Sequence, residues 1–143
     1  YAKNACIKNK YPYLYWSGNT IGEPYPTSIA NGWYVSKSDL KSFMEKKLIE
    51  IGLNQKESKD MMEYWIPQME SKNVPYYKIS FLTTKQMNTL VPMSIQPQPK
   101  SILRVFLDFL PLSKKPIDTI SPQNITPFIR DGFTVVEWGG LKR

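Results

Sequence analysis

The spacing of the apolar residues changes at Pro75, and this change constrains the possible folds more than any other feature of the sequence. Before Pro75, apolar residues between positions 40 and 66 recur every three or four residues, which is typical of amphipathic helices. After Pro75 the period is two, as in strands, whose successive side chains point to opposite faces. The alternation is longest over Ile102–Leu110, where Leu103, Val105, Leu107 and Phe109 share one face and Arg104, Phe106 and Asp108 share the other.

Two helices joined by a short link are predicted before the change. Ser38 and Asp39 can accept hydrogen bonds from free amides at the start of the first helix, and Gly52 can end it because glycine tolerates a left-handed backbone. Asn54 and Glu57 have the spacing of a capping box at the start of the second helix. Pro67 is expected to stop or kink this helix. The apolar stripes consist of Leu40, Phe43, Met44, Leu48 and Ile51 in the first helix and Met61, Met62, Trp65 and Ile66 in the second.

Short strands are predicted on both sides of this helix pair. They cover residues 13–16, 33–35, 76–81, 93–96, 102–110 and 133–138, and turn residues bound them. Gly139 and Gly140 are expected to close the last strand. The connection before it is expected to be extended and to contain no central strand, because it carries Pro111, Pro116, Pro122 and Pro127.

This order of elements predicts an α+β fold with a mostly antiparallel sheet and an inserted two-helix hairpin packed on one face. Strands lie before and after the helices and do not alternate with them, which argues against a doubly wound α/β fold. Residues 1–12 are expected to form a basic lead-in or arm. Residues 13–143 are expected to form one domain, since a chain of 143 residues suits a single hydrophobic core.

The composition excludes several kinds of catalytic site. The sequence has no His and one cysteine, Cys6, so Ser-His-Asp and Cys-His arrangements, internal disulfides and the usual zinc ligand sets are ruled out. It shows neither a glycine-rich phosphate loop nor the spacing of a calcium loop. We therefore expect no cofactor and no metal. The apolar runs also fall short of the roughly 20 residues that a membrane-spanning helix needs.

The positive charge of the chain is spread along the sequence. The net charge is +7, from 19 Lys and Arg against 12 Asp and Glu. Specific binding of nucleic acid is not expected, because it requires basic residues clustered on one face, and the only arginines are Arg104, Arg130 and Arg143. Weak binding of polyanions through Lys3, Lys8 and Lys10 stays an alternative.

Asp108 and Glu137 are the candidate catalytic residues, because each lies inside an apolar strand, where a carboxylate is unusual. If the two strands pair, Asp108, Arg104 and Glu137 converge. A pair of carboxylates could then serve a glycosidase-like hydrolase, with Arg104 as electrostatic support. The simpler interpretation, which we favour, is an Arg104–carboxylate pair across strands on a solvated face.

Aromatic residues are dense in the first quarter of the chain. Tyr15, Trp16, Trp33 and Tyr34 are the candidate ligand-binding residues, since sugar rings and peptides dock on exposed aromatic faces. Aromatic residues are also favoured in half-buried strands, so packing in the core is the default expectation.

Several segments resemble, in this order, the C-terminal part of an uncharacterised domain family of bacterial proteins, many of them predicted to be secreted or surface-attached. The most specific are Tyr64-Trp65-Ile66-Pro67-Gln68 and Gly132-Phe133-Thr134-Val135-Val136-Glu137-Trp138-Gly139-Gly140. The resemblance covers about residues 13 to 140 and implies no activity. It implies a β-rich segment upstream, so the chain is expected to be the C-terminal part of a longer protein.

These observations favour a non-enzymatic structural or binding module of an extracellular, cell-surface or virion assembly. A protein partner or self-association is expected, and carbohydrate or peptide ligands are possible. The alternatives are the carboxylate-dependent hydrolase and the weak polyanion-binding protein.

Overall fold

The computed structural model describes residues 13–143, so the expected arm at 1–12 lies outside the described residues. The described chain is a four-stranded sheet with helices on both faces. The elements in chain order are β1 (Trp33–Ser36), a 3-10 turn (Lys37–Asp39), α1 (Leu40–Ile51), α2 (Gln55–Glu70), β2 (Tyr76–Leu82), α3 (Thr84–Leu90), β3 (Ser101–Leu112) and β4 (Thr134–Lys142). The α+β class and the helix hairpin are confirmed.

The strand order is β1-β2-β3-β4, so β1 and β4 are the two edges. The pairs β1–β2 and β2–β3 are antiparallel, whereas β4 runs parallel to β3, with Arg104 opposite Glu137. The sheet is thus mostly antiparallel, as predicted. The parallel pair is possible because the long connection 113–133 returns the chain to the start of β3 before β4 begins.

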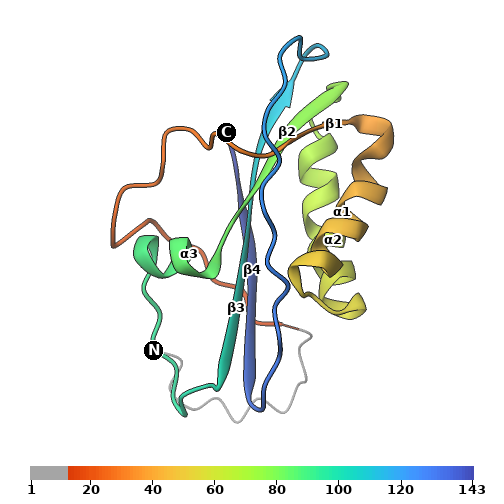
Figure 1. Cartoon of the computed structure of the whole chain (residues 1–143). Coiled ribbons are helices and arrows are strands. Elements are labelled where there is room, and N and C mark those ends of the chain that lie inside the picture. The colour runs from red at the N-terminus through yellow and green to blue at the C-terminus, as the bar shows by residue number, and fades with distance from the viewer. Residues whose placement is uncertain (1–12) are drawn as a thin grey trace.

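One face of the sheet packs on α1 and α2, as Figure 1 shows. The main core there combines apolar residues of both helices with alternate residues of the strands: Met44, Leu48, Met61, Met69, Tyr77, Ile79, Leu103, Val105, Leu107 and Phe109. Burying a side chain of this size contributes about 1.5–3 kcal/mol. The predicted helical stripes and the predicted faces of β3 therefore form this core.

The other face packs on α3 and on the segment after Trp16, which lie together on the opposite side in Figure 1. Its smaller core consists of Leu82, Met87 and Leu90, with Tyr25, Ile29, Val91 and Phe106 packed against it. The sequence prediction missed α3. Its capping box was nevertheless readable, since Thr83 and Gln86 have the Thr-x-x-Gln spacing and make both reciprocal hydrogen bonds.

Two predicted strands are absent from the structure. Tyr13–Trp16 makes no strand, because it contacts β4 through side chains instead of a backbone ladder. Met93–Gln96 is a link without regular structure between α3 and β3.

Several predicted boundaries also differ. The side chain of Ser36 caps the 3-10 turn before α1, whereas Asp39 makes no such cap for α1. The helix α2 continues past Pro67 to Glu70, because buried Met69 holds its last turn on the core. Pro111 lies inside central β3, opposite Tyr77 and past the last pair with β4, where its missing N–H breaks no ladder bond.

The pair Gly139 and Gly140 lies inside β4 and does not close it. A Cβ atom on Gly140 would lie 2.8 Å from the Trp65 ring, so this glycine lets the indole approach the strand. By contrast, Gly52 ends α1 with a φ of 122°, as expected of a glycine there.

Candidate functional site

The predicted polar residues Arg104 and Glu137 meet on the face that carries α3. Arg104 is 1% exposed, and its Nε donates to a carboxylate oxygen of Glu137. Its Nη1 donates to Asn88 Oδ1 at 3.0 Å and to the Val91 carbonyl at 2.7 Å, both at the end of α3. The expectation that Arg104 lies on a solvated face is wrong, because α3 covers this part of the sheet.

Asp108 lies further along β3 and belongs to a different cluster. Both of its oxygens accept hydrogen bonds from Arg143 Nε, at 2.8 and 2.9 Å, and Oδ2 also accepts from the Tyr25 hydroxyl at 2.6 Å. Burial is the larger cause that raises the pKa of Tyr25 above its ordinary range, and the hydrogen bond to Asp108 raises it further. The hydrogen bond to Asp108 also raises the pKa of Arg143. This cluster holds the segment around Tyr25 on the sheet.

The two carboxylates therefore share a face but do not form a catalytic pair. Glu137 lies opposite Arg104, and Asp108 follows Arg104 by four residues, which is about 13 Å along a strand. The carboxyls of a glycosidase lie roughly 5–9.5 Å apart. Each carboxylate also has its own guanidinium partner, Arg104 or Arg143. Among residues 13–143, no group of three or more acidic or cysteine side chains could hold a metal ion.

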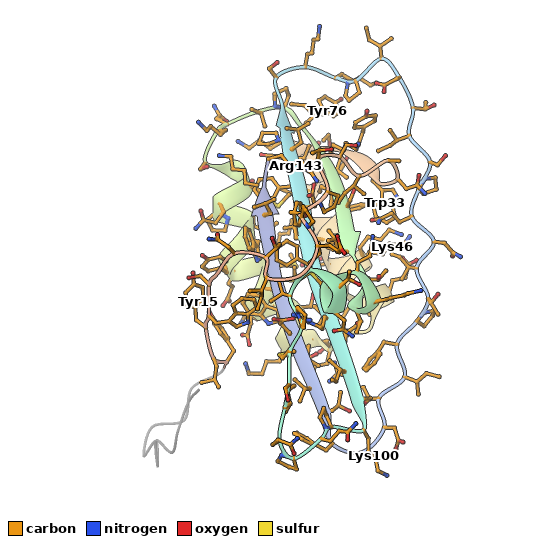
Figure 2. All side chains as sticks on the ribbon, turned by 90° about the vertical axis from the view of Figure 1, so that its left-hand side faces the viewer. Tyr15, Trp33, Lys46, Tyr76, Lys100 and Arg143 are labelled. Carbon is orange, nitrogen blue, oxygen red and sulfur yellow. The ribbon has the colours of Figure 1, made fainter. Side chains whose placement is uncertain are left out.

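The predicted aromatic residues separate into two sets at opposite edges of the sheet. Figure 2 shows Tyr15 and Trp33 on opposite sides of the sheet. On the first side, Trp16 Nε1 donates to Glu137 Oε1 at 3.0 Å, and Tyr15 is 73% exposed. Their neighbour Tyr13 stacks edge-on against Trp138, at 4.9 Å between ring centroids. This set lies against edge strand β4.

The second set, Trp33 and Tyr34, belongs to edge strand β1. The Trp33 ring faces the helices, and its centroid lies 5.5 Å from that of the Phe43 ring. Lys47 Nζ lies over the Trp33 ring, 4.9 Å from the centroid. Tyr34 points to the other face, where its hydroxyl donates to Asp118 at 3.1 Å. Desolvation and this hydrogen bond raise the pKa of Tyr34.

The outer backbone of β1 is open at Tyr34 and at the N–H of Ser36. The Lys37 N–H donates to the carbonyl of Pro75, the residue before β2, at 2.8 Å, and N–H groups alternate in direction along an antiparallel strand. Trp33 and Val35 therefore bond to β2, whereas Tyr34 directs its N–H and C=O groups, and Ser36 its N–H group, away from the sheet. The Ser36 carbonyl belongs to the 3-10 turn that follows. No backbone hydrogen bond from another described segment reaches those of Tyr34.

A groove of about 400 Å³ lies between this open edge and α1, and we name it the β1–α1 groove. It is lined by Trp33, Tyr34, Val35, Ser36, Asp39, Ser42, Phe43 and Lys46. Trp33 and Phe43 give it an apolar floor, and the open backbone forms one wall. Asp39 is the N-cap residue of α1, and Ser42 and Lys46 follow on the same side of the helix, so these polar side chains form the other wall.

A second cavity, of about 450 Å³, lies just beyond the end of β2, beside Leu103 and Arg104 near the start of β3. The segment 123–128 closes it, anchored by Gln123, whose side chain exchanges two hydrogen bonds with the Phe81 backbone at 2.7 and 2.9 Å. Thr84 Oγ1 accepts from the Arg104 backbone N–H at 2.9 Å on its wall. The hydrogen-bonding groups of Gln123 and Thr84 thus already have partners within the chain.

Sequence reasoning named Trp33 and Tyr34 but missed the groove itself. Ser42 and Lys46 belong to the polar side of a predicted helix and carry no signal of their own. The strand order, which leaves β1 unpaired on one side, was needed to find them.

Comparison of the chain with protein-family models, with curated proteins and with solved structures found no match. The resemblance carried by residues 64–68 and 132–140 therefore stays a prediction. No helix of the described residues is long and apolar enough to cross a membrane.

Proposed function

We propose that this chain is a non-enzymatic binding module that takes an extended segment of a partner protein into the β1–α1 groove as an added strand. The observation that carries the proposal is the open N–H and C=O of Tyr34 beside an apolar floor made by Trp33 and Phe43. Strand addition uses backbone hydrogen bonds for affinity and side-chain pockets for specificity.

Binding suits this site better than catalysis does. The two carboxylates that a hydrolase would need are engaged in separate ion pairs, and neither lines the groove. An edge strand with an open backbone, in contrast, is a template for another strand. The partner we propose is therefore a protein, within the secreted, surface or particle assembly expected from the sequence.

Selection from a random hexapeptide library tests the proposal, with the Tyr34→Pro variant as the decisive comparison. Proline removes the outward N–H of Tyr34 and breaks no bond to β2, so the sheet is retained. The Tyr34→Thr variant is the matched control, because it also lacks the ring but keeps the N–H.

We expect enriched peptides to bind wild-type protein and Tyr34→Thr and to lose binding to Tyr34→Pro, with circular dichroism unchanged in all three. Enrichment that is equal on wild-type protein and on Tyr34→Pro would contradict strand addition at β1. So would the absence of any enriched peptide.

A further inference from the structure

The outer edge of β1, beside the β1–α1 groove, is closed at its Trp33 end by the chain's own backbone. The Gly32 N–H, which faces outward like that of Tyr34, donates to the Ser121 carbonyl at 2.9 Å. Ser121 therefore occupies the position that an added strand would need beside Gly32. A partner strand can pair with Tyr34 and accept from the Ser36 N–H, but it cannot continue in line past Trp33.

The two ends of the groove carry opposite charges. Lys46 lies beside Trp33 at the closed end, where Figure 2 labels both residues. At the open end the Asp39 carboxylate accepts a hydrogen bond from Ser36 Oγ at 2.6 Å. Lys46 follows Asp39, the N-cap residue of α1, by seven residues, which is about 10 Å along the helix axis. Among residues 13–143, no carboxylate lies within ion-pairing distance of Lys46.

These features fix the direction of the added strand. A strand antiparallel to β1 begins beside Ser36 and Asp39 and ends beside Trp33 and Lys46. In that direction its carboxyl end meets the lysine, and its amino end lies nearer the aspartate. The parallel direction would bring the carboxyl end to Asp39, where like charges repel.

We infer that the groove binds the free C-terminal end of a partner protein, with the terminal carboxylate held by Lys46. The inference rests on the strand addition proposed above. The last residue of the tail lies opposite Trp33 and so on the same face, where the Phe43 ring favours an apolar side chain. The residue before it lies opposite Tyr34 and exchanges both backbone hydrogen bonds with it.

The test uses hexapeptides that are enriched on the 143-residue chain from a library with free C-termini. Each peptide is synthesised with a free carboxylate, with a C-terminal amide, and with two added C-terminal glycines. Affinities are measured by calorimetry for wild-type protein, Lys46→Gln and Lys41→Gln. Lys41 is the matched control, because it is exposed on the same helix but does not line the groove.

We expect the amide and the extended peptide to bind about tenfold more weakly than the free carboxylate, the scale of a hydrogen-bonded charge. Lys46→Gln should remove the difference between the acid and the amide, and Lys41→Gln should keep it. If all three peptide forms bind alike and Tyr34→Pro still abolishes binding, the terminal-carboxylate inference fails and strand addition stands. If no peptide binding depends on Tyr34, both fail.

Discussion

Arg104 and Glu137 lie directly opposite each other in the parallel β3–β4 pair and form an ion pair beneath α3. The Arg104 side chain is fully buried and that of Glu137 is 15% exposed. A buried charge that loses its partner is costly, whereas a well-packed apolar pair in its place can be neutral.

The first prediction concerns this pair. Glu137→Leu leaves the guanidinium of Arg104 buried without a counter-charge, and we expect it to lower the free energy of unfolding by about 3 kcal/mol. The double variant Arg104→Met/Glu137→Leu removes both charges and should recover much of that loss. Urea unfolding measures both. Additive losses in the double variant would show that the two side chains are not coupled.

The second prediction concerns alkaline pH. Burial and the hydrogen bond to Asp108 raise the pKa of Tyr25, so at alkaline pH the folded chain keeps a proton that the unfolded chain releases. Stability from this group is therefore complete below about pH 10, the ordinary tyrosine pKa, and falls as the pH rises above it.

Urea unfolding between pH 8 and pH 11 measures this loss, and Tyr25→Phe should make it less steep. Part of the slope should remain, because the pKa values of Tyr34 and Tyr77 are also raised. An identical slope in the two proteins would contradict the buried environment assigned to Tyr25.

The third prediction compares the two neighbouring glycines of β4. A Cβ on Gly140 would lie 2.8 Å from the Trp65 ring and 2.9 Å from the Leu107 carbonyl, whereas one on Gly139 would lie 3.3 Å from the Phe106 ring. We expect Gly140→Ala to cost about 1–3 kcal/mol as an overpacking change and Gly139→Ala to cost less. Thermal unfolding of the two variants measures the difference. Equal losses of stability would contradict the close contact between Gly140 and the Trp65 ring.

The helix hairpin and the long strand were predictable because their signals are local. The stripe of Leu40, Met44 and Leu48 and the alternation along β3 follow from the helix and strand periods alone, and tertiary packing agrees with both. The one missed helix, α3, spans only residues 84–90, too short for a hydrophobic period, although its capping box was present.

The burial of Arg104 and the groove were not predictable from local patterns. The sequence showed that Arg104 and Asp108 share a face, but not that α3 would cover that face. The aromatic residues of the first quarter are close in sequence yet separate to opposite edges, because β1 and β4 are the outer strands. Strand order depends on long-range pairing, which one sequence does not reveal.

The most direct test of strand addition at β1 is amide hydrogen exchange, measured by NMR with and without an enriched hexapeptide. Bound peptide should slow exchange at Tyr34 and Ser36, whose N–H groups face outward, and leave the already bonded Trp33 and Val35 little changed. Protection confined to the β4 edge at Val136 and Trp138, or no protection at Tyr34, would contradict the account.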